Sequence, residues 1–135
     1  MRKIWSSNIL GRAIDEAFQE VNELRDEMEA AFAGTPDVFR DSTGRAREKA
    51  AEDLDAASTT PFVPESVANL DVKWIEMVGK GVYRPQRRDN VVRCLQSCVA
   101  RLLTSTNDDI SELKKELQVA IDILIPLSYQ TDLAM

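Results

Sequence analysis

Arginine is concentrated in one stretch of an otherwise acidic chain, just before an expected helix. The stretch reads VYRPQRRDN over residues 82–90 and lies in segment 79–103, where 6 basic and 1 acidic residues give 6 − 1 = +5. The whole chain carries a formal charge of −6. Free N–H groups at a helix N-terminus attract anions, and arginine binds phosphate or carboxylate with two parallel hydrogen bonds. The stretch predicts an anion site whose candidate residues are Lys80, Tyr83, Arg84, Arg87 and Arg88.

The same arginines have a second, plainer interpretation. The chain contains 23 Asp and Glu residues, so the arginines of this stretch can pair with carboxylates of the chain itself. Such pairs would form within one molecule or between copies, and they would leave no site for a ligand. We favour this interpretation, because the stretch matches no known phosphate-binding motif.

The residues needed for most enzyme chemistry are missing. The chain has no histidine, which excludes Ser-His-Asp and Cys-His catalysis and the histidine-based zinc and iron motifs. Cys94 and Cys98 are four residues apart, so a helix places both thiols on one apolar face, as reduced core residues. The adjacent acids Asp108 and Asp109 suit a helix start. The sequence therefore predicts no enzyme activity, no cofactor and no metal site.

A long helix is expected over residues 8–33, capped by Ser7 or Asn8. At 1.5 Å per residue it would be about 39 Å long, comparable to the diameter of a compact chain of this size. Apolar residues recur along it at alternating spacings of 4 and 3, which is typical of a coiled coil and predicts a partner helix from this chain or from a second copy. We favour a second copy and therefore expect a homo-oligomer. The candidate interface residues are Leu10, Ile14, Val21, Leu24 and Met28.

Three further segments complete an expected single domain over residues 1–135. An outer helix is predicted over 44–57, and a helical hairpin over 88–125 that is capped by Thr106 or Asn107 and ended by Pro126. An extended linker and loop containing prolines is expected over 58–86, with Phe62 and Val63 anchoring it to the core and a strand-like piece without a partner near Trp74. The fold class is all-α, a bundle of three to four helices.

No stretch approaches 18 uncharged apolar residues, and polar residues interrupt the segment after Arg2 and Lys3. The sequence therefore predicts a cytoplasmic protein that does not associate with membranes.

Four short motifs occur in order: ELRDEM at residues 23–28, PESVANL at 64–70, Val72-x-Trp74 and RRDN at 87–90. In this respect the chain resembles small, uncharacterised helical proteins of tailed bacteriophages. The resemblance implies a phage origin and an all-helical fold, and it implies no catalytic residues.

Together these observations predict a non-enzymatic, oligomeric interaction protein. We expect a phage accessory factor that binds and modulates a host protein in the host cytoplasm. The alternative is a nucleotide or nucleic-acid binding protein that uses the basic segment 80–101.

Overall fold

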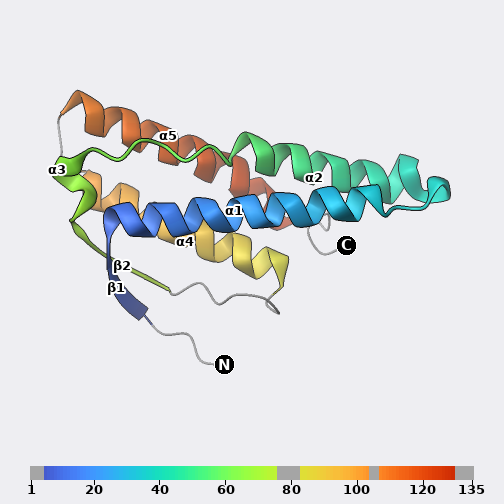
Figure 1. The fold of residues 1–135 in the computed structure, drawn as a ribbon, viewed down its shortest axis with the longest axis horizontal. Helices are drawn as coiled ribbons and strands as arrows, with labels where there is room; N and C mark the ends of the chain where they lie inside the picture. The colour runs from blue at the N-terminus through green and yellow to red at the C-terminus, as the bar shows by residue number, and fades with distance from the viewer. Residues whose placement is uncertain (1–4, 76–82, 104–106, 130–135) are drawn as a thin grey trace.

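The structure is a computed structural model that describes residues 5–75, 83–103 and 107–129. Most of these residues are helical, which confirms the predicted helical fold class (Figure 1). A single pair of short strands accompanies the helices in the described part of the chain. The main elements are β1 Trp5–Ile9, α1 Leu10–Ala33, α2 Arg45–Ala56, α3 Glu65–Ala68, β2 Asp71–Ile75, α4 Arg84–Leu102 and α5 Asp108–Leu124.

Helix α1 runs along the length of the molecule and organises its core (Figure 1). Its apolar residues return to one side every three or four positions, so the helix buries a continuous stripe. Helix α2 packs along its C-terminal half, α4 packs against another side, and α5 completes the bundle. The residues of this stripe that are buried are Leu10, Ala13, Ile14, Ala17, Phe18, Val21, Leu24 and Met28.

The start of α1 differs from the expectation. The helix begins at Leu10 after Ile9, whose side chain provides no cap, whereas Ser7 and Asn8 belong to strand β1. The backbone N–H of Leu10 instead donates to the carbonyl of Leu70 at 2.7 Å. Gly11 lets α3 approach closely, because a Cβ there would lie 3.3 Å from the carbonyl oxygen of Ala68. Contacts with a distant segment thus fix the entry into α1.

The expected linker over 58–86 is more structured than predicted. It contains helix α3 and strand β2, and β2 pairs with β1 in antiparallel register from Trp5 opposite Ile75 to Ile9 opposite Asp71. The strand near Trp74 therefore has a partner, which sequence analysis did not identify. Between α2 and α3 the chain remains extended over residues 58–64, and it crosses from one to the other beside α5 (Figure 1).

Helices α4 and α5 follow one another in the chain and pack against each other (Figure 1). Helix α4 begins four residues earlier than expected, at Arg84, with Pro85 in its first turn. Proline suits this position because its missing N–H would have no helical partner there. Asn107 caps α5 as predicted, since its Oδ1 accepts from the N–H of Asp109 at 2.9 Å. A 3₁₀ turn, Ile125–Tyr129, follows α5, and Leu127 is buried.

No helix among residues 5–75, 83–103 and 107–129 has the length and apolar character needed to cross a membrane.

Candidate functional site

Two of the predicted anion-binding arginines face the acidic side of α1. The guanidinium of Arg87 contacts both carboxylate oxygens of Glu27, with Nη2 2.7 Å from Oε2 and Nη1 3.0 Å from Oε1. Its Nε donates a hydrogen bond to the carboxylate of Glu20. Glu23 lies at the edge of this group, 3.8 Å from Arg87 Nη2. Arg84 adds a hydrogen bond from Nε to Oε1 of Glu27 at 3.0 Å. We call these five residues the arginine cluster.

The arginine cluster follows from helical spacing on both partners. Glu20, Glu23 and Glu27 lie three or four residues apart, so they share one side of α1. Arg84 and Arg87 share one side of α4 for the same reason. The pKa of Glu27 is lowered because Arg87 and Arg84 donate hydrogen bonds to its carboxylate. Burial instead raises the pKa of Glu20, although the hydrogen bond and charge of Arg87 oppose this rise.

Arg88 is used in a different way. Its side chain is almost fully buried, and Nη1 donates to the carbonyls of Leu124 at 3.1 Å and Ile125 at 3.2 Å. These carbonyls end α5, where a helix has no backbone donors for its last C=O groups. Nη2 also lies 2.7 Å from the carboxylate of Asp89. Arg88 therefore connects the C-terminal end of α5 to α4.

The structure thus places the residues of the predicted anion site differently from the expectation. Arg87 and Arg88 lie inside α4 and do not precede it, so they do not surround free N–H groups at a helix start. Tyr83 is 80% exposed and directed to solvent, and Lys80 lies outside the described residues. The guanidinium groups of Arg84 and Arg87 contact the chain's own carboxylates, which is the arrangement expected from the plainer interpretation.

The predicted oligomer interface is part of the core of the single chain. Its five residues, Leu10, Ile14, Val21, Leu24 and Met28, all have 0% exposure. The heptad pattern is therefore matched by α2 and α4 of the same chain, and these side chains have no surface left for a second copy. An assembly of copies would have to use other residues.

The two thiols lie in the core, as their position on an apolar helix face predicts. Cys94 and Cys98 are free and have 0% exposure, and Cys94 Sγ lies 3.5 Å from the carbonyl oxygen of Ala13. The pKa of Cys94 is raised by its hydrogen bond with Cys98 and by burial, so the thiol stays protonated. Within the described ranges, no group of three or more Cys, Asp and Glu side chains is placed to hold a metal ion.

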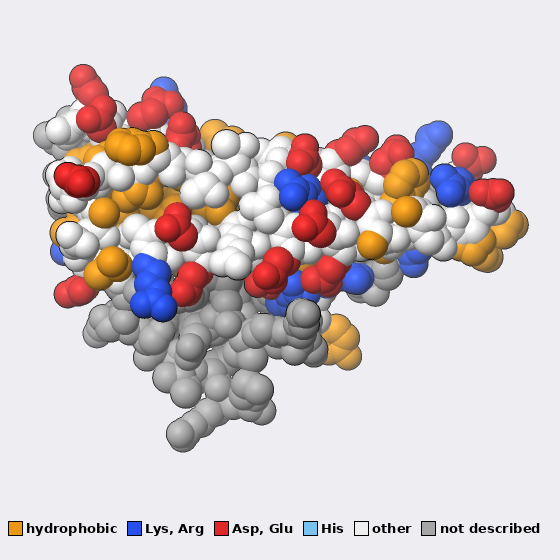
Figure 2. Space-filling view, viewed as in Figure 1, with side chains coloured by type: hydrophobic (Ala, Val, Ile, Leu, Met, Phe, Trp, Pro, Cys, Tyr) orange, Lys and Arg blue, Asp and Glu red, His pale blue; other side chains and the backbone are white. Residues whose placement is uncertain are grey.

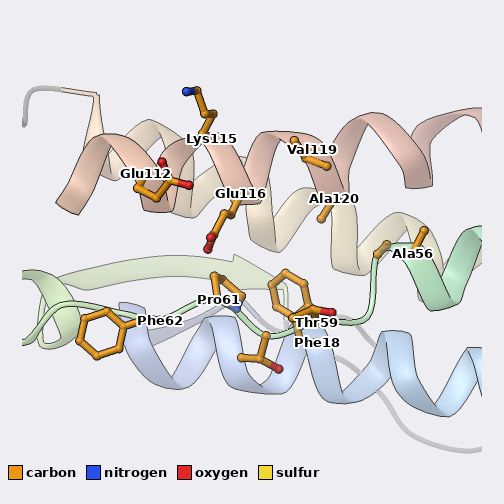
Figure 3. Close-up of a pocket in the computed structure, with 12 residues that line it drawn as sticks. Phe18, Ala56, Thr59, Pro61, Phe62, Glu112, Lys115, Glu116, Val119 and Ala120 are labelled. Carbon is orange, nitrogen blue, oxygen red and sulfur yellow. The ribbon is translucent and has the colours of Figure 1, made fainter. Parts of the chain in front are cut away.

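An open hollow lies between α5 and residues 56–62, where α2 ends and the extended segment begins, and we call it the linker groove. Its volume is about 350 Å³. Phe18 of α1 lies beneath it, while Pro61 and Phe62 line one side and Val119 and Ala120 line the other (Figure 3). In the same orientation as Figure 1, Figure 2 shows apolar side chains gathered between α5 and α1, bordered by acidic ones.

Two large apolar side chains of the linker groove are exposed to water. Phe62 is 79% exposed and Val119 is 54% exposed, whereas Phe18 beneath them is 1% exposed. The prediction that Phe62 anchors the linker to the core is therefore wrong, while its neighbour Val63 is half-buried against the core. Pro61 is buried, whereas Phe62 next to it is exposed.

The α5 side of the linker groove is charged. Glu112 and Glu116 lie one helical turn apart, and both carboxylates are exposed. No ion pair joins either of them to another described residue. Sequence analysis missed the groove, because Val119 and both glutamates lie off the apolar stripe of α5. The one available signal was a phenylalanine between two prolines.

Comparison of the chain with protein-family models, with curated proteins and with solved structures finds no match, so its function is inferred from the geometry of these two sites.

Proposed function

We propose that the protein is a non-enzymatic interaction protein and that its linker groove binds an apolar segment of a partner protein. The observation that carries this proposal is the exposure of Phe62 and Val119 on opposite sides of one hollow. Exposed apolar surface around a concave site is typical of protein-binding surfaces. A partner side chain placed between them would remove both from water and would contact the buried ring of Phe18 beneath.

The arginine cluster supports this choice over a nucleotide or nucleic-acid binding protein. A phosphate bound by Arg84 or Arg87 would have to displace carboxylates that already lie within about 3 Å of the guanidinium nitrogens. It would also leave Glu20, whose side chain is 12% exposed, with a buried charge and no cation. Breaking a buried ion pair in this way is strongly unfavourable.

The resemblance to helical proteins of tailed phages implies a phage origin, and a phage protein acts inside a bacterial host. On that basis the partner is a protein of the bacterial host, and this chain is an accessory factor that modulates it in the cytoplasm. A homo-oligomer remains compatible with this function, provided that copies meet through exposed surface and not through the buried stripe of α1.

Selection of random 12-residue peptides displayed on a surface tests the proposal. We expect peptides that bind the full chain and lose at least about tenfold in affinity with Val119→Glu, because the new charge would have to be buried beneath the peptide. Val119 is exposed on a helix, so the variant should fold. The matched control is Val38→Glu, the same change at an 80% exposed valine beyond the far end of α1.

Selected peptides that bind Val119→Glu as tightly as the unchanged chain would overturn the proposal. Binding lost equally with Val38→Glu would overturn it too, because a general change in charge would then explain the result.

A further inference from the structure

We infer that the segment bound in the linker groove carries an arginine beside its apolar anchor, and that Glu112, Glu116 and Phe62 receive its guanidinium. This inference rests on the proposed function and specifies the chemistry of the partner. All three residues line the same hollow, with the two carboxylates on α5 and the ring on the extended segment opposite (Figure 3).

The first argument is a pair of like charges at helical spacing. Glu112 and Glu116 are four residues apart on α5, where like charges repel one another. Lys115 lies between them in sequence and also lines the hollow, but its amino group points away from the Pro61–Phe62 segment, whereas the carboxylate of Glu116 points toward it (Figure 3). Neither glutamate has an ion-pair partner among the residues described, so a cation entering the groove would relieve the repulsion.

The acidic side of α1 shows which cation two carboxylates on one helix bind in this protein. Glu20 and Glu27 also project from one helix, and there Arg87 bonds to both. Glu112 and Glu116 present the same residue type on one helix side, but no described residue takes the place of Arg87. A partner's arginine would complete this side of α5 as Arg87 completes α1.

The second argument is the aromatic ring opposite the carboxylates. Phe62 is 79% exposed, so one face is free for a flat cation to stack on it. A guanidinium stacks on an aromatic ring and at the same time donates in its own plane to carboxylates. Its apolar stem would lie along Pro61 and Ala57, which line the groove. Lysine lacks the planar group, so arginine fits these surroundings better.

The same charges argue against other occupants. Two carboxylates without an ion-pair partner among the described residues repel the phosphates of nucleic acid and of anionic lipid headgroups, while the exposed side chains of Phe62 and Val119 favour an apolar group that covers them. A peptide that alternates apolar and basic side chains satisfies both requirements.

The peptide selection described above also tests this inference when it is repeated on two charge variants. Glu112→Gln/Glu116→Gln removes both charges from the linker groove. Its matched control is Glu48→Gln/Glu52→Gln, which removes two exposed charges at the same four-residue spacing from α2, in a separate hollow between α1 and α2. We expect peptides selected on the unchanged chain and on the control to place arginine next to an apolar residue, and those selected on Glu112→Gln/Glu116→Gln to lack this preference.

One synthetic peptide then measures how much the arginine contributes to binding affinity. Replacing the arginine of the most enriched peptide by citrulline, which keeps the shape and removes the charge, should weaken binding to the unchanged chain about tenfold. The same replacement should change little on Glu112→Gln/Glu116→Gln, because the charged partners are already absent.

The outcomes separate the two proposals. Peptides whose binding is lost with Val119→Glu but which show no preference for arginine would overturn the inference about arginine and leave the proposed function standing. Arginine preference that persists on Glu112→Gln/Glu116→Gln would overturn the assignment of these carboxylates. Peptides that bind independently of Val119 would overturn both proposals.

Discussion

The arginine cluster and the linker groove are built from similar parts but differ in whether the parts are already matched. In the arginine cluster, three carboxylates of α1 meet two guanidinium groups of α4, and Arg87 is 6% exposed. In the linker groove, two carboxylates and an exposed phenylalanine line an open hollow, and Lys115, which also lines it, points its amino group away from the Pro61–Phe62 segment. The difference teaches that a concentration of charge in the sequence does not by itself locate a binding site. The residues that remain free to bind a partner are Glu112, Glu116 and Phe62, which form no unusual pattern in the sequence.

The comparison predicts that substitutions in closed regions lower stability, whereas substitutions in the linker groove change binding. The largest loss is expected in the core that the heptad stripe forms. Leu24→Ala should lower the free energy of unfolding by about 4 kcal/mol, because Leu24 is fully buried and the cavity cannot fully collapse. Urea unfolding measures the loss.

Light scattering on the same Leu24→Ala sample distinguishes the core from an interface between copies. The mass of the folded protein should be unchanged. A smaller mass with unaltered stability would show that Leu24 acts between molecules and would contradict its place in the core.

The next largest loss is expected in the arginine cluster. Arg87→Met should destabilise the chain by about 3 kcal/mol, because Glu20 would keep its position with its main cation removed. The matched control is Arg12→Met, which breaks an exposed pair with Glu16 and should cost at most about 0.5 kcal/mol. A stable Arg87→Met variant that loses salt-dependent nucleotide binding would favour the alternative function instead.

The periodic part of this fold could be predicted from sequence because helices depend on local pattern. Helices α1, α2 and α5 lie within one or two residues of their expected ends, since apolar spacing and the cap at Asn107 mark them. The start of α4 also has a local signal, because Pro85 suits a first helical turn, although the prediction placed this residue in the loop over 58–86.

The remaining features depend on contacts between distant residues. The pairing of β1 with β2 joins segments more than 60 positions apart in sequence, and neither strand has a strong pattern alone. The heptad stripe of α1 predicts a helical partner but not which chain provides it. Likewise, the exposure of Phe62 follows from the path of the segment across α1 beside α5, which no local pattern specifies. Sequence therefore located the helices, and it did not locate the candidate site.

A smaller effect, with a distinct pH dependence, separates two carboxylates within the arginine cluster. Glu27→Gln should cost about 1 kcal/mol at pH 7, a modest value because Glu27 is 37% exposed. The pKa of Glu27 is lowered in the folded chain, so its stabilising effect is present above the pKa of the unfolded chain and is lost as pH falls through the folded value. The difference between Glu27→Gln and the unchanged chain should therefore shrink as pH falls below about 4.3, the ordinary pKa of a glutamate carboxyl.

Glu20→Gln is the matched control, because burial raises the pKa of Glu20. Its ionised form is the less favoured one in the folded chain, and any stability from its raised pKa is present at low pH and lost as pH rises. Glu20→Gln should therefore cost less than Glu27→Gln at pH 7 in urea unfolding. Equal losses from the two variants would show that burial does not distinguish these carboxylates.

The smallest effect on stability is expected where the effect on binding is largest. Phe62→Ala should change the free energy of unfolding by no more than about 0.5 kcal/mol, because the ring is 79% exposed and packs little against the core. The same variant should abolish measurable binding of peptides selected on the linker groove, since it removes one wall and the stacking surface. Phe39→Ala, at a half-exposed phenylalanine beyond α1, should be equally stable and should bind normally. A large loss of stability with Phe62→Ala would place this ring in the core and would remove the contrast between a closed cluster and an open groove.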